Sequence, residues 1–238
     1  MLLNCDMGES FGIYSLGADA AIMPHIDLAN VACGFHGSDA NHMSATVRLA
    51  IRHGVAIGAH PSLPDLQGFG RREMAIGREE LRNVILYQVG ALTAFLRASG
   101  ARLSHIKPHG ALYGMTARDP EAAGAMADAA DVFDVPIMGL AGTLHESVYT
   151  ARGHAFWPEY FADLDYDPQG KLVITRTHPQ IDAALVEARV HAALEGRLLT
   201  RDGGELPLRA STICIHSDTP NAADLSRRIA RILQNKTR

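Results

Sequence analysis

Short apolar runs alternate with longer amphipathic stretches along the whole chain. Seven runs have the length and the apolar or β-branched content of buried strands: residues 2–5, 28–33, 55–59, 103–106, 135–140, 172–175 and 212–215. Apolar positions at helical spacing fill residues 39–53, 79–99, 183–194 and 222–233. Asp39 is the expected N-cap of the first of these helices, and Gly54 and Gly100 are expected to end the first and the second.

The alternation of strands and helices predicts a parallel sheet covered by helices. Because so many units follow one another, we expect the sheet to close into a TIM-like (β/α) barrel, an α/β fold with seven strands. No repeat, low-complexity tract or linker divides the chain, so we expect one domain over residues 1–238. An open doubly wound sheet is the alternative, and it is disfavoured because no glycine-rich phosphate loop follows the first strand.

Composition narrows the functional class. The 238 residues are 47% hydrophobic, enough for a sizeable core, and 22 basic against 26 acidic side chains give a net charge of −4. This balance argues against nucleic-acid binding, which needs a basic surface. The start of the chain has neither a basic segment nor a long apolar run, so we expect a cytoplasmic protein with no membrane span. Three Cys without paired spacing exclude a disulfide scaffold.

Polar residues collect where the expected strands end, which is where the loops of a parallel α/β fold converge. They are Asn4, Asp6, Glu9, His36, Asp39, His60, Asp65, Arg71, Arg72, Lys107, His109, His216 and Asp218. One His after a strand is commonly a hydrogen-bonded turn or core residue. Here the same exit pattern occurs at His36, His60, His109 and His216, each followed by Gly, Pro or Ser. The repetition predicts a site at this end of the sheet.

Two chemistries suit these residue types. Imidazoles with a carboxylate can hold a divalent metal that activates water, and the candidate ligands are Asp6, His36 and His60. Alternatively, Asp6 or His60 acts as a general base while Lys107 and a second His stabilise an oxyanion. Both point to hydrolysis at a carbonyl carbon. Taken singly, Asp6 is equally compatible with a loop cap, and Lys107 with a solvated surface charge.

Other features allow weaker inferences. The Pro- and Gly-marked loop of residues 61–70 precedes Arg71 and Arg72, and it suits a lid with a carboxylate clamp as well as an ordinary solvated Arg pair. His105 and His109 have the spacing of helical zinc ligands, but the intervening Pro and the missing Glu disfavour a metalloprotease. The three Cys are expected to be buried and inert, with Cys33 left open as a nucleophile because His36 is near in sequence.

Five ordered motifs carry a resemblance that covers most of the chain. They are NCDMGE at 4–9, ANVACGFH at 29–36, GAHPS at 58–62 with FGRR at 69–72, KPHGALY at 107–113, and GLAG at 139–142. In these motifs the chain resembles the LamB/YcsF family, which provides the A subunit of prokaryotic ATP-dependent 5-oxoprolinase. The resemblance implies a barrel similar to those of glycoside hydrolases and polysaccharide deacetylases. It also implies cleavage of the lactam of 5-oxo-L-proline to L-glutamate, together with subunits B and C.

The chain has no G-x-x-x-x-G-K-[ST] and no G-x-G-x-x-G motif, so ATP, the co-substrate, is expected to bind to the partner subunits. This chain would then hydrolyse the activated lactam. For that reaction we expect catalytic roles for Asp6, His60, Lys107 and His109, and substrate binding by Glu9, Asn30, His36, Asp39, Arg71 and His216. The alternatives are a stand-alone metal-dependent amidase or deacetylase-like hydrolase, and a non-catalytic small-molecule-binding barrel. A homo-oligomer is compatible with a chain of this size.

The C-terminal half departs from the family pattern. Leu164 follows Phe161-Ala162-Asp163 where the family usually has Arg, and Ser217 stands where a Gly usually follows the last strand's His. The stretch Arg176-Thr177-His178-Pro179 lacks the small residues expected nearby. If the missing Arg contacts substrate in the family, we expect this chain either to prefer another lactam or to have lost the partner-coupled reaction.

Overall fold

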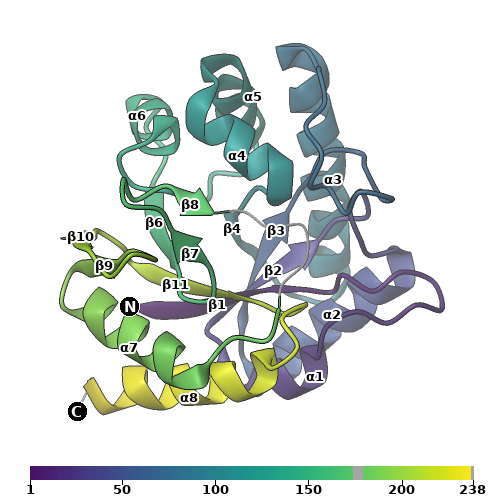
Figure 1. The fold of residues 1–238 in the computed structure, drawn as a ribbon. Helices are drawn as coiled ribbons and strands as arrows, with labels where there is room; N and C mark the ends of the chain where they lie inside the picture. The colour runs from purple at the N-terminus through teal and green to yellow at the C-terminus, as the bar shows by residue number, and fades with distance from the viewer. Residues whose placement is uncertain (174–178, 237–238) are drawn as a thin grey trace.

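The computed structural model describes residues 1–173 and 179–236. Seven parallel strands close into a barrel in the order β1-β11-β6-β5-β4-β3-β2 (Figure 1). The strands are β1 (Leu2–Met7), β2 (Leu28–Ala32), β3 (Ala56–His60), β4 (Leu103–Ile106), β5 (Ile137–Gly139), β6 (Phe156–Phe161) and β11 (Thr212–His216). The predicted seven-stranded, TIM-like α/β barrel is confirmed.

One predicted barrel strand is wrong. Within residues 172–175, β8 (Leu172–Val173) pairs antiparallel with β7 (Asp165–Tyr166) outside the barrel, and Thr175 lies outside the described residues. The seventh barrel strand is β6, whose sequence FWPEYF lacks the continuous apolar run of a buried strand. Its Glu159 is nonetheless buried, because it pairs with a lysine across the barrel. Of the stretch 176–179, residues 176–178 lie outside the described residues.

Helices surround the barrel on the outside. They are α1 (Asp19–Ile22), α2 (Ala40–His53), α3 (Arg78–Ala98), α4 (Gly110–Arg118), α5 (Pro120–Ala130), α6 (Leu144–Ala151), α7 (Ala183–Leu194) and α8 (Ala222–Lys236), with a 3-10 turn at Met23–His25. A separate hairpin joins β9 (Arg197–Leu199) to β10 (Glu205–Pro207). In Figure 1, α3 to α6 lie above the barrel, and α1, α2, α7 and α8 lie below it. No helix among the described residues has the length and hydrophobicity that a membrane crossing requires.

Local signals account for the helices that the sequence predicts. The Asp39 side chain accepts hydrogen bonds from the first backbone N–H groups of α2, and Gly54 ends that helix in the left-handed conformation at φ 68°. The helix α3 buries one face, which includes Leu81, Ile85 and Leu92. In contrast, α5 is rich in Ala and buried nearly all round, between α3, α4 and α6, so it shows no amphipathic stripe.

The barrel strands divide their side chains between two environments. In β1, Leu3, Cys5 and Met7 belong to the hydrophobic core, whereas the alternate residues Asn4 and Asp6 meet side chains from other strands. Asp6 reaches Lys107, which follows β4 on the opposite wall, so this second set lies inside the barrel. The barrel interior is therefore polar near the carboxyl ends of its strands.

Candidate active site

A buried lysine stands at the centre of the barrel mouth. The Nζ atom of Lys107 lies 2.9 Å from Asp6 Oδ1, 3.1 Å from Glu159 Oε1 and 3.0 Å from Cys214 Sγ. Burial by itself would lower the pKa of this lysine, but the neighbouring carboxylates and thiol outweigh burial and raise the pKa well above its ordinary value. Lys107 is therefore a fixed ammonium group rather than the alternative, a solvated surface charge.

Asp6 presents its two carboxylate oxygens to different partners. Oδ1 accepts hydrogen bonds from Asn30 Nδ2 at 2.8 Å and from Lys107 Nζ. Oδ2 faces His60 Nε2 at 3.2 Å and His216 Nε2 at 3.8 Å. Burial would raise the pKa of Asp6, but His60 and Lys107 hold it well below the ordinary range. One oxygen of an ionised carboxylate is thus anchored, while the other faces two imidazoles.

Amides below the carboxylate fix its position. Asn30 Nδ2 also donates to Asn4 Oδ1 at 2.8 Å, and Asn30 Oδ1 lies 2.7 Å from His105 Nε2. Burial lowers the pKa of His105 to about 3, so this neutral ring donates its Nε2 proton to the amide oxygen. His105 lies on β4, and no helix joins it to His109, which agrees with the rejection of a helical zinc motif.

The two ring nitrogens of His60 face atoms from three different residues. Its Nδ1 lies 2.8 Å from the carbonyl oxygen of Lys107, and its Nε2 faces Asp6 Oδ2 and, at 3.0 Å, His109 Nδ1. Carbonyl and carboxylate oxygens only accept hydrogen bonds, so each ring nitrogen of His60 faces an acceptor. His109 Nε2 donates to the carbonyl of Phe69 at 2.7 Å, which leaves its Nδ1 as an acceptor. His60 therefore lies between two oxygen acceptors and beside a neutral His109.

His216 is a second cation next to Asp6. Its backbone N–H donates to Asp163 Oδ2 at 2.7 Å, and its Nδ1 lies 3.1 Å from the same oxygen. Burial lowers the pKa of His216, but Asp163 more than compensates and raises the pKa to about 9. Asp163 and Glu159, which hold the two cations His216 and Lys107, were missed by the sequence reasoning. The available signal was a charged residue inside or directly after an apolar run.

Three imidazoles and a carboxylate lie close enough together to be candidate metal ligands. Among the described residues, ligand atoms of Glu9, His36, His60 and His109 lie within 4.8 Å of one another. However, the rings of His36 and His109 stack in parallel, 3.7 Å apart between centroids and 6° between planes. An imidazole binds a metal in the plane of its ring, so one ion cannot lie in both planes. The four residues, as arranged, do not fit a single ion.

Glu9 and His36 form a contact of their own. His36 Nε2 lies 3.1 Å from Glu9 Oε1, and both side chains are buried. Burial and Asp6 raise the pKa of Glu9, while burial and His60 lower that of His36. Both groups therefore favour their neutral forms. A second group with metal-ligand proximity, Asp6, Cys214 and His216, includes the thiol that contacts the Lys107 ammonium, which opposes a further cation.

A cavity of about 50 Å³ opens above the Lys107–Asp6 pair. Its lining residues are Asp6, His60, Arg71, Lys107, Pro108, His109, Gly110, Tyr113, Phe161, Leu164, Leu172 and His216. Charged and imidazole groups form one part of the lining, and apolar and aromatic side chains form the rest. All four predicted catalytic residues line it, and so do Arg71 and His216 from the predicted substrate-binding set. The substituted position Leu164 is also part of this wall.

The other predicted substrate-binding residues do not line the cavity. Glu9, Asn30 and His36 are buried beside it. Glu9 contacts His36, and Asn30 donates a hydrogen bond to Asp6. Asp39 lies apart from the cavity, where it caps α2 and accepts a hydrogen bond from Gly12 N at 2.8 Å. Ser217, the second substituted position, places its Oγ 3.4 Å from Glu9 Oε2.

The cysteines are held as protonated thiols. All three are buried, and burial raises the pKa of Cys33 to about 12. The Cys33 Sγ lies 3.2 Å from the carbonyl oxygen of Val31. The neighbouring sequence around His36 therefore does not make Cys33 a thiolate.

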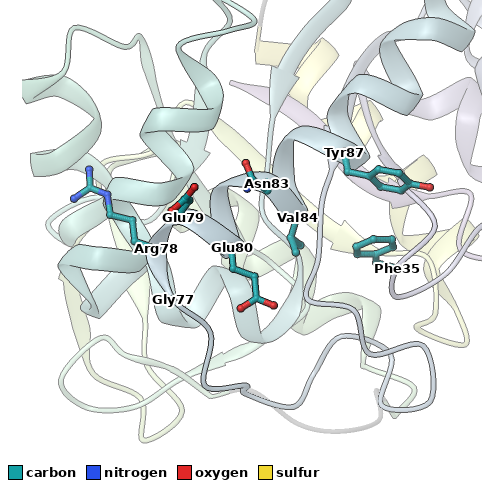
Figure 2. Close-up of a pocket in the computed structure, with 8 residues that line it drawn as sticks. All are labelled: Phe35, Gly77, Arg78, Glu79, Glu80, Asn83, Val84 and Tyr87. Carbon is teal, nitrogen blue, oxygen red and sulfur yellow. The ribbon is translucent and has the colours of Figure 1, made fainter.

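A larger pocket of about 710 Å³ lies at the N-terminal end of α3 (Figure 2). Phe35 and Tyr87 stack at one end of it, with ring centroids 5.5 Å apart, and Arg78 lies at the other. Arg78 pairs with Asp128 at 2.9 Å. None of the residues that line the smaller cavity is among its lining residues, and no His or Cys lines it. Its size therefore does not make it the reactive site.

Comparisons with known proteins identify the family of this chain. The family model described as LamB/YcsF family matches residues 1–238. The chain belongs to the LamB/YcsF family. It is 45% identical over 238 residues to the 5-oxoprolinase A subunit of Vibrio cholerae, and the match covers 97% of this chain and 96% of the relative. It is 44% identical over 237 residues to the lactam utilization protein lamB of Emericella nidulans, covering 98% and 93% of the two chains.

Solved structures agree with the family. The crystal structure of a lactam utilization protein from Thermus thermophilus superposes with a TM-score of 0.92 at 43% identity, and the match covers 100% of this chain and 97% of the other. A putative cellobiose-phosphate cleavage protein from Enterococcus faecalis has a TM-score of 0.51 at 14% identity, covering 98% and 89%. This second likeness concerns the fold alone.

Proposed function

We propose that this LamB/YcsF chain is the hydrolytic subunit of an ATP-dependent 5-oxoprolinase, which converts 5-oxo-L-proline to L-glutamate. The observation that carries the proposal is the ionised Asp6, held among Lys107, His60 and His216 at the end of a partly apolar cavity. This set offers a base, a proton donor and cations within reach of one reacting carbon. The names of the similar proteins, which refer to 5-oxoprolinase and to lactam utilization, support the same substrate class.

A lactam carbonyl is a poor electrophile because the ring nitrogen shares its lone pair with it. Transfer of a phosphoryl group to the carbonyl oxygen removes this resonance and makes the carbon open to attack by water. No nucleotide-binding glycine motif occurs in this chain, so we assign ATP binding and phosphoryl transfer to partner subunits, B and C. A reaction that consumes ATP, together with three free cysteines, suits a cytoplasmic enzyme.

Asp6 Oδ2 is the proposed general base. It takes a proton from water as the water oxygen attacks the activated carbon. Lys107 and His216 stabilise the negative charge that develops, and their contacts with the substrate weaken their hold on Asp6, which increases its basicity. The sequence also allowed His60 as the base, but each of its ring nitrogens faces an oxygen acceptor, so we assign it the opposite role.

His60 is the proposed general acid. It donates its Nε2 proton to the ring nitrogen as the C–N bond breaks, while the new hydroxyl on the carbon loses its remaining proton to solvent, which yields an acyl phosphate with a free amino group. Asp6 then returns its new proton to His60 across their 3.2 Å contact. A second water hydrolyses the acyl phosphate to glutamate and phosphate. His109 stays neutral throughout and orients His60.

Reconstitution with partner subunits tests this proposal. The purified chain is combined with the B and C subunits of a related 5-oxoprolinase, and glutamate and phosphate are followed together. We expect one phosphate per glutamate, with a loss of at least about 100-fold for His60→Ala. The matched control is His53→Ala, an exposed His at the end of α2, which is expected to keep full activity. Full activity in His60→Ala contradicts the assignment of roles.

A stand-alone, metal-dependent amidase is the second candidate. The proximity of Glu9, His36, His60 and His109 favours it, whereas the stacked rings oppose it. Metal analysis of the purified protein separates the two candidates. A stoichiometric metal, with lactam or amide hydrolysis that needs no ATP and stops with a chelator, would replace the first proposal by the second.

A further inference from the structure

The rim of the cavity holds an ion pair between two loops that are distant in sequence. Arg71 follows β3, and Asp218 follows β11. Their side chains meet at 2.9 Å between Nη2 and Oδ2, and they are only 12% and 11% exposed. The Arg71 guanidinium also lies over the Phe69 ring, 4.9 Å from its centroid. The loop is tied to α4, because Ala111 N donates to the carbonyl of Gly70 at 2.8 Å. Arg71 is therefore a charged group that its contacts hold in a defined position at the rim.

The cavity is too small for the proposed substrate while this pair is closed. Its volume of about 50 Å³ accommodates about three to five water molecules. A lactam ring with a carboxylate is several times larger than a water molecule. Admission of such a ligand requires a lining group to move, and Arg71 is the cation of the lining that is held from the rim rather than from the barrel interior.

We propose that the Asp218 carboxylate occupies the place on Arg71 that the substrate carboxylate takes, so that exchange of one carboxylate for the other opens the cavity. This inference rests on the proposed function and names the feature by which the site selects its substrate. A guanidinium binds a carboxylate through a planar pair of N–H donors, so a ligand with such a group keeps the Arg71 charge paired when it replaces Asp218. A lactam without a carboxylate has no anionic group that can replace Asp218 on Arg71, so the Arg71–Asp218 ion pair stays closed. Asp218 thus acts as a specificity-determining residue.

Two ligands that share a ring test the exchange. Binding of 5-oxo-L-proline and of 2-pyrrolidinone, which lacks the carboxylate, is measured by titration calorimetry without ATP or partner subunits. Asp218→Asn removes the competing charge, and we expect it to bind 5-oxo-L-proline at least about tenfold more tightly than the wild type. Its affinity for 2-pyrrolidinone should be unchanged. Arg71→Gln should lose the preference for the carboxylate.

The neighbouring arginine provides the matched control. Arg72 is mostly exposed, pairs with the buried Asp65 and does not line the cavity, so Arg72→Gln should bind both ligands as the wild type does. Asp218→Ser serves as a second variant, and thermal unfolding is measured for all variants, so that a loss of folding is recognised.

Two outcomes overturn the exchange: equal tightening of both ligands in folded Asp218→Asn and Asp218→Ser, or no tightening of 5-oxo-L-proline in either. Neither outcome touches the proposed function, which depends on ATP-coupled glutamate release in the reconstituted enzyme. Conversely, carboxylate-selective binding in Asp218→Asn, with no glutamate release by the reconstituted wild type, would support the exchange and reject the proposed function.

Discussion

The two faces of the barrel strands perform different tasks with the same backbone. On β1, Leu3, Cys5 and Met7 pack against the surrounding helices, while Asn4 and Asp6 point into the barrel. The outer layer gains free energy from every buried methylene, and its contacts tolerate similar side chains. The inner layer buries charges, which is costly unless each is paired. The difference teaches that apolar stabilisation resides mainly outside the barrel, while the groups of the proposed reaction lie inside it.

The largest expected effect comes from removing the central cation of the inner layer. Lys107→Met removes the ammonium partner of the buried Glu159 and Asp6 carboxylates, and leaves Asp6 with its imidazole neighbours alone. We expect a loss of about 3–5 kcal/mol of stability and a fall in kcat of about 1,000-fold. Urea denaturation and the reconstituted glutamate assay measure the two effects.

The exposed Lys171→Met is the control for this substitution, and it should change neither quantity. Activity of Lys107→Met within tenfold of the wild type would show that the inner layer is structural rather than reactive.

The outer layer should respond in the opposite way. Leu92 on α3 is fully buried in the hydrophobic core, so Leu92→Ala removes apolar contacts and is expected to cost about 2–5 kcal/mol in the free energy of unfolding. The kcat of the folded fraction should stay unchanged, because no group of the cavity is altered. Leu185→Ala, at a position 42% exposed, should cost less than about 0.5 kcal/mol. A loss of kcat in Leu92→Ala at a temperature where it is folded would break the division between the layers.

The same division decides what the sequence could predict. Helices such as α3, with apolar residues on one face, were predicted because the outer layer imposes a periodic pattern. Strand β6 was missed because Glu159 interrupts its apolar run, and this residue is tolerated only through a contact with Lys107 across the barrel. The strand ends correctly located the cavity residues Asp6, His60, Lys107 and His216.

The contacts between individual side chains inside the barrel could not be predicted from the sequence. The two oxygen acceptors of His60, the carbonyl of Lys107 and the carboxylate of Asp6, converge only in the folded barrel. Asp39 is a residue type that commonly binds ligands, but its side chain accepts hydrogen bonds from backbone N–H groups of α2 and caps that helix. Spacing therefore located the site, while the roles of individual residues depend on three-dimensional contacts.

The pH dependence of stability distinguishes the layers again. Asp163 raises the folded-state pKa of His216 to about 9, above the ordinary value of 6.5. The stabilisation is therefore fully present below pH 6.5 and is lost as the pH rises from 6.5 through 9. We expect the free energy of unfolding to fall by about 2–3 kcal/mol over that window. In His216→Gln this part of the fall should disappear, and an unchanged profile would contradict the ion pair with Asp163.

The smallest expected effect concerns the apolar wall that the cavity shares with the outer layer. Leu164 lines the cavity at the position where the family pattern has Arg. An apolar side chain, typical of the outer layer, therefore lies beside the charged groups of the inner layer. Leu164→Arg adds a cation beside the ligand, and we expect it to bind 5-oxo-L-proline about tenfold more tightly, equivalent to about 1.4 kcal/mol. Titration calorimetry measures the change, with 2-pyrrolidinone and the exposed Leu185→Arg as controls. Equal affinity in Leu164→Arg and the wild type would mean that this wall faces the ring of the lactam and not its carboxylate.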